Sequence, residues 1–242
     1  MSPENANLDR TLILGALDDE VEAFREHADV RSISNRRGYT VSEGSIRGHE
    51  VVISRSGVGK SLSAMLTQYL TDRYAPSRIL FTGVAGALNP ALEIGDTLIA
   101  ESCMQYDMDV TALGFELGEV PYTPYRILSC DPQLVALART CRPSTGTVRV
   151  GRVLTGDRFI VTSKDASDRY LRDELAGDAV EMEGASAGLV ATVNEIPFLI
   201  MRTISDKADA STSVNFAQFV QQASRTAWEL VDHVMEALSN TD

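Results

Sequence analysis

The sequence predicts an α/β fold, because short apolar runs that end in small residues alternate with stretches of helical period. The chain has 242 residues, of which 44 % are hydrophobic and 23 % are charged, and both values are ordinary for a globular domain. No linker, repeat or low-complexity tract interrupts the pattern. We therefore expect one domain over residues 11–239, preceded by a flexible segment over residues 1–10.

Six apolar segments are predicted to form strands, and several of them are typical of central strands that are buried on both faces. These segments are residues 11–16, 51–54, 78–83, 96–101, 148–154 and 198–204.

Helical periodicity is clearest in the last segment of the chain. Apolar residues recur at intervals of three or four over residues 216–238, and Asn215 can cap the first turn. Two shorter helices are predicted near residues 62–70 and 134–138. The apolar face of the first would consist of Leu62, Met65, Leu66, Tyr69 and Leu70.

Charge and cysteine content exclude several classes of partner. The net charge of −12 opposes attraction to nucleic acids and to anionic membranes. The three cysteines form neither a CxxC motif nor a Cys/His ligand spacing, so a disulfide framework and a zinc site are both unsupported. No signal sequence or membrane-spanning run is apparent. These features predict a cytoplasmic protein that binds neither nucleic acid nor membrane.

Two glycine-rich turns do not match nucleotide-binding motifs. Residues 54–61 resemble a P-loop, but Ser54 stands where that motif needs its first glycine. We interpret this segment as a tight turn that enters a helix at Lys60. Residues 82–86 lack the GxGxxG spacing. Neither ATP nor a dinucleotide is therefore expected as a cofactor.

Acidic side chains supply the best candidate site. Glu20 follows the first predicted strand, Glu181 and Glu183 precede a helix of small residues, and Asp206 ends the last strand. Strand ends in α/β sheets gather at ligand sites, where carboxylates can act as acid, base or hydroxyl acceptor. Acidic residues also favour the first turns of helices, so each cluster has a structural alternative. Joint use of Glu181 and Glu183 requires an extended or turning segment, which directs both to one side.

Seven short segments form an ordered set along the chain: residues 15–21 (GALDDEV), 56–60 (SGVGK), 82–86 (TGVAG), 107–114 (DMDVTALG), 155–160 (TGDRFI), 180–183 (VEME) and 202–206 (RTISD). In order and spacing, this set resembles the bacterial methylthioadenosine/S-adenosylhomocysteine nucleosidases of the nucleoside phosphorylase superfamily. The resemblance implies a single three-layer αβα domain with a central mixed sheet. It also implies a homodimer that hydrolyses an adenine N-glycosidic bond without a metal or cofactor.

The resemblance implies a role for each catalytic candidate. Glu20 would activate the attacking water, with Arg202 nearby. Glu183 would hold the ribose hydroxyls together with the backbone of Met182. Asp206 would protonate the departing adenine, and Ser205 is the expected support for that proton. These roles agree with the chemistry, because adenine leaves poorly as an anion and the remaining sugar is oxocarbenium-like.

The resemblance also implies the substrate contacts. Phe159 and Ile160 would read the adenine edge, with the Phe159 ring stacked on the base, whereas Phe216 and Met182 would line the sugar and thioether region. The other expected contacts within the chain are Glu181, Val84 and Val58. The loop over residues 111–125 has no regular period. Its neighbourhood would bring Val110, Leu113 and Pro121 to the thioether pocket of a partner subunit.

Departures from the family pattern leave the substrate tail open. Val84 stands where these nucleosidases commonly have serine, Leu113 replaces an aromatic residue, and Tyr106 replaces a histidine. Methylthioadenosine, S-adenosylhomocysteine, 5'-deoxyadenosine and a futalosine-type nucleoside all remain candidates. A nucleoside phosphorylase is disfavoured because residues 16–20 place carboxylates where phosphate would bind. A nucleoside-binding protein without turnover is the other alternative.

Overall fold

The computed structural model describes residues 9–36, 38–160, 168–206 and 216–239. Residues 1–8 of the predicted N-terminal segment lie outside the described residues, and the first strand begins at Arg10. The strands are β1 (Arg10–Gly15), β2 (Asp29–Arg36), β3 (Tyr39–Ile46), β4 (His49–Arg55), β5 (Arg78–Phe81), β6 (Val84–Ala87), β7 (Thr97–Gln105), β8 (Leu128–Ser129), β9 (Val148–Thr155), β10 (Ala179–Glu181) and β11 (Phe198–Asp206).

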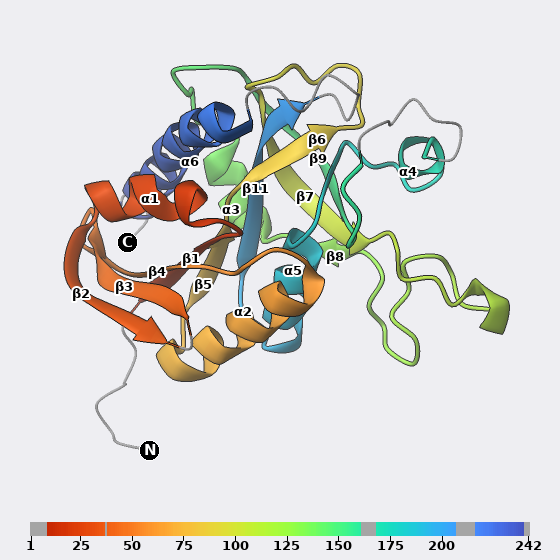
Figure 1. The fold of residues 1–242 in the computed structure, drawn as a ribbon, viewed down its shortest axis with the longest axis horizontal. Helices are drawn as coiled ribbons and strands as arrows, with labels where there is room; N and C mark the ends of the chain where they lie inside the picture. Colours follow the sequence, from red (N-terminus) through yellow and green to blue (C-terminus); the bar gives the residue numbers. More distant parts are fainter. Residues whose placement is uncertain (1–8, 37, 161–167, 207–215, 240–242) are drawn as a thin grey trace.

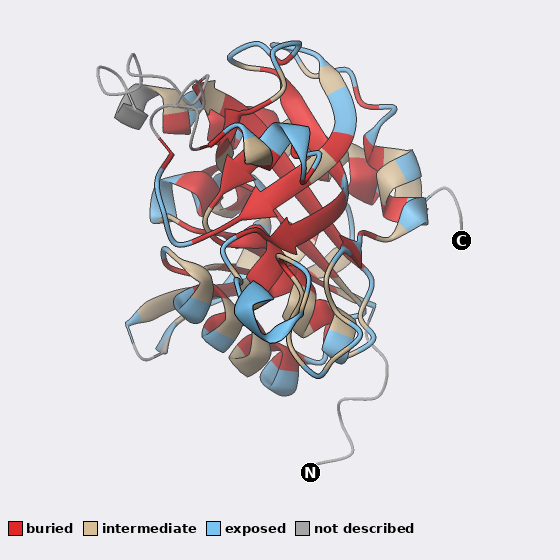
Figure 2. Cartoon of the chain, turned by 90° about the vertical axis from the view of Figure 1, so that its right-hand side faces the viewer, coloured by how far each residue is buried: buried red, intermediate tan, exposed pale blue. Residues whose placement is uncertain are grey.

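These strands form one sheet with both parallel and antiparallel neighbours. Its order is β2-β3-β4-β1-β5-β11-β6-β10-β9-β7-β8. Strand β11 pairs with β5 in parallel and with β7 in antiparallel register, so β11, β6, β10, β9 and β7 close on themselves. Figure 2 shows that the central strands are buried almost throughout. The mixed sheet that the sequence predicts is confirmed.

Five helices cover the sheet in two groups, and the short helix α4 belongs to neither group. The helices of the described residues are α1 (Asp18–His27), α2 (Lys60–Tyr74), α3 (Pro132–Ala138), α4 (Tyr170–Asp173), α5 (Gly184–Val193) and α6 (Phe216–Ser239). Figure 1 shows α1, α3 and α6 on one side of the sheet and α2 with α5 on the other. The three-layer αβα arrangement is therefore confirmed. No helix in the described part of the chain is both long and apolar enough to cross a membrane.

All six predicted strands are present, but five others were missed. Strands β2 and β3 form an edge hairpin with many polar residues, and β8 and β10 are only two and three residues long. Strand β6 follows β5 after a break at Gly83, whose φ of 149° interrupts the extended chain. Such short or polar strands are held by their neighbours rather than by their own pattern.

The buried face of α2 differs from the predicted one. Leu66 and Leu70 are buried as expected, but Leu62 and Met65 are 40 % and 52 % exposed. Small polar residues, including Ser63, turn toward α5 instead, because the two helices pack closely. The Ser63 hydroxyl donates to the Glu183 carbonyl oxygen over 3.2 Å. The predicted cap Asn215 lies outside the described residues.

Candidate active site

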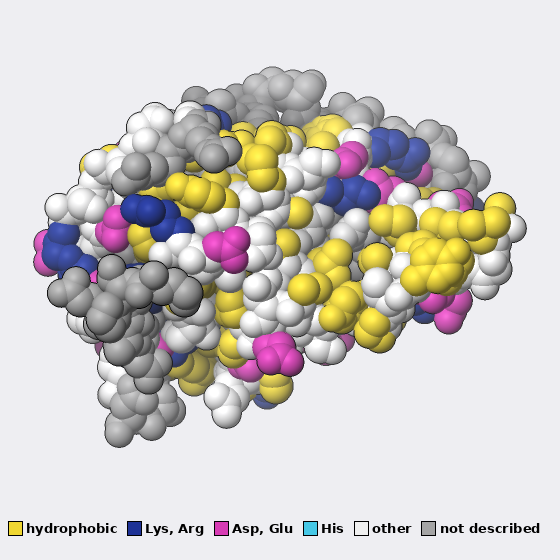
Figure 3. Space-filling model, turned by 90° about the horizontal axis from the view of Figure 1, so that it is seen from below, with side chains coloured by type: hydrophobic (Ala, Val, Ile, Leu, Met, Phe, Trp, Pro, Cys, Tyr) yellow, Lys and Arg dark blue, Asp and Glu magenta, His cyan; other side chains and the backbone are white. Residues whose placement is uncertain are grey.

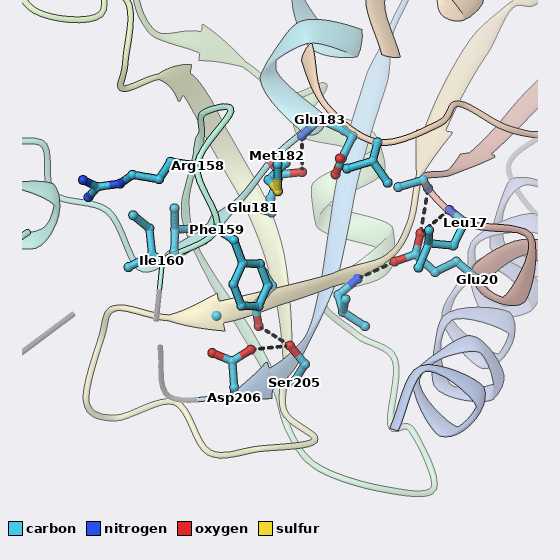
Figure 4. A pocket seen from close by; sticks show the side chains of 16 residues that line it. Leu17, Glu20, Arg158, Phe159, Ile160, Glu181, Met182, Glu183, Ser205 and Asp206 are labelled. Carbon is cyan, nitrogen blue, oxygen red and sulfur yellow. Dashed lines mark hydrogen bonds between the residues drawn. The ribbon is translucent and has the colours of Figure 1, made fainter. Parts of the chain in front are cut away.

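A cavity of about 270 Å³ lies beside the segments that follow β1, β4, β9 and β10, and beside β6 and the end of β11. Figure 4 shows its wall, with Glu20 on one side and Phe159, Ser205 and Asp206 toward the other. Glu20, Glu183 and Asp206 all line this cavity. The three strand-end acidic sites that the sequence singles out therefore do meet.

Glu20 is held rigidly by backbone donors. Its Oε2 accepts hydrogen bonds from Ala16 N (2.6 Å) and Leu17 N (3.0 Å), and its Oε1 accepts one from Val84 N (3.1 Å). Burial raises the pKa of Glu20, although the Arg202 charge and these backbone donors lower it. The same contacts cap the first turn of α1, so Glu20 stabilises its helix and also presents a fixed carboxylate to the cavity.

The two neighbouring carboxylates lie outside the cavity wall. Asp18 and Asp19 are exposed and do not line the cavity. Asp18 pairs with Arg25 at 3.3 Å and with Arg55 at 3.2 Å. Both residues lie in the first turn of α1, where the helix dipole favours negative charge.

Arg202 and Glu181 form a buried ion pair under the cavity. Arg202 is 1 % exposed, and its Nη2 and Nε lie 2.5 and 3.2 Å from Glu181 Oε2. The guanidinium carbon also lies 4.6 Å from the centre of the Phe81 ring. Arg202 is therefore a buried cation beneath the cavity wall rather than a residue that lines it.

Glu181 lines the cavity, but its oxygens already have protein partners. Besides Arg202, its Oε2 accepts from Glu183 N (3.1 Å) and Gly184 N (2.7 Å), and its Oε1 accepts from the Thr155 hydroxyl. Glu181 thus borders the cavity with oxygens that already accept from protein donors. Its carboxylate orients Arg202 and satisfies donors at the start of α5.

One nitrogen of Arg202 has no hydrogen-bond partner within the described residues. This atom, Nη1, is buried. A Cβ added to Gly83 would lie 2.9 Å from Arg202 Nη1 and 2.8 Å from Glu20 Oε1. Both atoms therefore lie against Gly83, and residue 83 has no room for a side chain. A buried cationic donor beside a carboxylate is a suitable place for a polar guest.

Glu183 lies at the start of α5, opposite the N-terminus of α2. Its Oε1 accepts a hydrogen bond from Gly59 N over 2.8 Å. Burial and the nearby Glu181 charge raise the pKa of Glu183 to about 8, although the Gly59 donor and Arg202 lower it. Glu181 and Glu183 border the same cavity, which is the condition that the sequence analysis sets for their joint use.

Ser205 connects Asp206 to the backbone. The Ser205 Oγ lies 2.7 Å from Asp206 Oδ2 and 3.3 Å from the Ala85 carbonyl oxygen. A serine has only one hydroxyl proton, so it donates to one of these acceptors at a time. When the hydroxyl donates to the Ala85 carbonyl oxygen, Ser205 Oγ is placed to accept from a protonated Asp206 carboxyl, which is the support that we expect from the sequence.

Several other predicted residues line the cavity, and a few do not. Those that line it are Val58, Val84, Phe159, Ile160, Met182 and Ser205. Six further lining residues were not singled out from the sequence, although each lies within one of the family-like segments: Ala16, Leu17, Ala85, Gly86, Arg158 and Val180. Val110, Leu113 and Pro121 belong to the chain between β7 and β8 and do not line the cavity of their own subunit. Phe216 begins α6, but its side chain lies outside the described part of the structure.

The site has no ligand set for a metal. Among the described residues, no group of three or more His, Cys, Asp and Glu side chains is arranged to hold an ion. The acidic residues at the cavity instead accept hydrogen bonds from backbone, hydroxyl or guanidinium donors.

Comparison with known proteins identifies the family. A family model described as the phosphorylase superfamily matches residues 10–236. The 5'-methylthioadenosine/S-adenosylhomocysteine nucleosidase of Bacillus thuringiensis (strain Al Hakam) is 34 % identical over 232 residues, which cover 95 % of this chain and 99 % of that protein.

Solved structures agree with this assignment. The 5'-methylthioadenosine/S-adenosylhomocysteine nucleosidase from S. pneumoniae, solved with a transition-state inhibitor, superposes with a TM-score of 0.88 at 29 % identity, covering 95 % of this chain and 99 % of that chain. The futalosine hydrolase of Helicobacter pylori gives 0.86 at 26 % identity, with 95 % and 98 % covered. The chain therefore belongs to the phosphorylase superfamily and, within it, to the family of 5'-methylthioadenosine/S-adenosylhomocysteine nucleosidases.

Proposed function

We propose that this protein hydrolyses the N-glycosidic bond of an adenosine-type nucleoside to adenine and the free pentose derivative. The observation that carries the proposal is the meeting of Glu20, Glu183 and Asp206 in one cavity, with Arg202 Nη1 beside Glu20. The nucleosidase relatives and the structural neighbour with a transition-state inhibitor support the same reaction.

Glu20 is the proposed general base. The nucleophilic water would accept a hydrogen bond from Arg202 Nη1 and donate one to Glu20 Oε1, since both atoms lie against Gly83 and Nη1 has no partner within the described residues. Burial raises the pKa of Glu20, which strengthens it as a base while the backbone donors keep its oxygens in place. When Glu20 takes a proton from this water, the water oxygen becomes a stronger nucleophile toward the anomeric carbon.

Asp206 is the proposed general acid, and Glu183 is the proposed partner of the ribose. Protonation of the purine at N7 lets adenine leave as a neutral molecule. The sugar then carries positive charge, which the Glu20 carboxylate stabilises electrostatically, whereas Glu183, whose pKa is raised to about 8, holds the ribose hydroxyls by hydrogen bonds. Phe159, 55 % exposed at the rim of the cavity, offers a ring face on which the base can stack.

The electrostatics of the cavity favour water over phosphate as the nucleophile. Three carboxyl groups, those of Glu20, Glu181 and Glu183, line the cavity, and Glu20 lies against Gly83. The nearest buried cation, Arg202, is already paired with Glu181. An inorganic phosphate placed there would be repelled by the carboxylates. This arrangement argues for hydrolysis rather than phosphorolysis.

The 5' substituent is best assigned by a substrate panel. Methylthioadenosine, S-adenosylhomocysteine, 5'-deoxyadenosine and futalosine differ in the group that must pass Val58, Met182 and Leu17, which line the cavity. Liquid chromatography of the released base gives kcat/KM for each. We expect adenine from at least one of the three adenosine compounds. Absence of base release from every compound, with the folded protein at high concentration, would contradict the proposed function and favour a nucleoside-binding protein.

A homodimer is part of the proposal. Leu113 and Tyr122 are 71 % and 89 % exposed on the loop between β7 and β8, and Leu62 and Met65 are exposed on α2. Figure 3 shows hydrophobic side chains gathered on this protruding part of the surface and on the adjacent face. Exposed apolar area of this kind is typical of an interface. Burial against a second copy would bring Val110, Leu113 and Pro121 toward the partner's cavity.

Light scattering tests this assembly directly. The proposal predicts a dimer at assay concentration, and Leu113→Asp should lower both the dimer fraction and turnover. A fully active monomer would contradict it, and the loop would then be interpreted as a lid over its own cavity.

We also propose a cytoplasmic location. Cys103, Cys130 and Cys141 are all free and buried, and burial raises the pKa of each thiol. Free thiols are typical of proteins in a reducing compartment. Fractionation of cells that express the protein, followed by immunoblotting, tests this location.

A further inference from the structure

Three segments that are far apart in the sequence are joined beside the cavity by three charged side chains. Lys60 Nζ lies 2.5 Å from Asp107 Oδ1. Asp107 Oδ2 accepts a hydrogen bond from Asp157 N over 2.9 Å. Asp157 Oδ1 in turn accepts one from Lys60 N over 2.8 Å. The three residues close a ring of contacts between the start of α2 and the segments that follow β7 and β9.

The first consequence concerns the N-terminus of α2. Gly59 precedes this helix and has no side chain to cap it, so Asp157 supplies the missing acceptor from another part of the chain. A Cβ on Gly59 would lie 3.1 Å from Asp157 Oδ1, and the φ of Gly59 is 91°. With the helix end fixed in this way, Gly59 N is directed at Glu183 Oε1. The ring of contacts thus orients the donor that holds Glu183.

The second consequence concerns the segment proposed to read adenine. Asp107 holds the backbone of Asp157, which directly precedes Arg158 and Phe159 in the cavity wall. The neighbouring Tyr106 donates its hydroxyl to the Arg158 carbonyl oxygen over 3.4 Å. Two adjacent residues at the end of β7 therefore fix the backbone on which the Phe159 ring depends.

We propose that Lys60 and Asp107 are positioning residues, which hold the adenine-binding segment and the Gly59 donor to Glu183 in register. The inference rests on the proposed function, because it assigns these residues a role in binding the base and the ribose. Neither side chain lines the cavity, so both act through Asp157. Their side chains are only 17 % and 29 % exposed, which limits the screening of the pair by solvent.

Two variants and one matched control test the inference. Asp107→Asn cannot accept from both Lys60 Nζ and Asp157 N, because an amide has a single acceptor oxygen. Lys60→Met removes the cation and keeps an apolar stem. The matched control is Asp232→Asn. Asp232 lies on α6, has a similarly exposed side chain (25 %) and pairs with Arg47.

The readouts are the Kd of adenine by isothermal titration calorimetry and the separate kcat and KM of the preferred nucleoside. We expect the Kd and KM to rise about tenfold in Asp107→Asn and in Lys60→Met, with kcat reduced less, because misplaced contact groups weaken binding. The double variant should lose no more affinity than either single variant, since each single substitution already breaks the same network of contacts. Lys60→Arg should recover most of the affinity, and Asp232→Asn should match the wild type.

The outcomes separate this inference from the proposed function. A wild type that neither binds adenine nor releases it would overturn both. A wild type that does so, with Lys60→Met and Asp107→Asn unchanged in Kd and KM, would overturn the inference alone. An equal loss in Asp232→Asn would also overturn it, because general destabilisation would then explain the effect. If Asp107→Asn does not fold, judged by circular dichroism, the Lys60→Met and Lys60→Arg pair decides the matter.

Discussion

Replacing Asp206 by Asn separates acid catalysis from structural support at the same position. Asp206 is 4 % exposed and ends β11, and Ser205 Oγ lies 2.7 Å from its Oδ2. The Asn amide oxygen can accept the same hydroxyl, and its size is almost unchanged. The folded structure and the cavity should therefore persist in Asp206→Asn.

The expected loss is confined to the chemical step. An amide can donate a hydrogen bond to the purine but cannot transfer a proton to N7. Positioned acid catalysis is typically worth about 10² to 10⁴ in rate, which is about 3 to 5 kcal/mol of activation free energy. Turnover of an adenosine nucleoside should fall by at least about 10², whereas ligand affinity should change much less.

Two substrates distinguish this loss from misfolding. An aryl riboside releases its phenol without protonation at N7, so Asp206→Asn should hydrolyse it with a much smaller loss than it shows on the adenosine nucleoside. Adenine release is followed by chromatography, phenol release by absorbance, and folding by thermal unfolding. Equal losses on both substrates, or near-normal adenine release, would refute Asp206 as the acid.

Three further predictions concern the surroundings of the cavity. Ser205→Ala removes the hydroxyl oxygen that can accept from protonated Asp206 and should slow adenine release by up to about tenfold, since a neutral hydrogen bond is worth about 0.5–1.5 kcal/mol; unchanged release would contradict the support role. Glu181→Gln leaves Arg202 buried without its counterion and should lower the free energy of unfolding in urea by about 3–5 kcal/mol. The pKa of Glu183 is raised from 4.5 to about 8, so the folded state retains a proton that the unfolded chain releases, and this contribution to stability is lost as pH rises through that range. The free energy of unfolding should therefore decline less steeply between about pH 5 and pH 8 in Glu183→Gln than in the wild type, and an unchanged slope would contradict this assignment.

The sequence predicts the central strands because their apolar runs are self-evident. It does not predict the edge hairpin of β2 and β3, in which polar residues alternate with few apolar ones and pairing is specified by the neighbouring β4. The α2 face was misjudged for a related reason. Leu62 and Met65 fit a helical apolar stripe, but the close approach of α5 favours small side chains on the buried face.

The acidic residues of the site were predictable from their positions after strands and from the family resemblance. The different contacts of these acidic residues were not predictable. Glu181 and Glu183 look equivalent in the sequence, yet Glu181 pairs with Arg202 on a neighbouring part of the sheet and Glu183 accepts from Gly59. Lys60 was interpreted only as the start of a helix, because nothing local indicates a partner at Asp107. Pairings across long sequence separations depend on the fold.

Phosphorus NMR of the reaction in phosphate buffer tests the central claim most directly. The account predicts that adenine and free pentose form while the spectrum shows inorganic phosphate alone, and that adenine is released at the same rate without phosphate. It places carboxylates rather than unpaired cations around the nucleophile. A new signal from a pentose 1-phosphate, with adenine release that stops when phosphate is removed, would contradict the account.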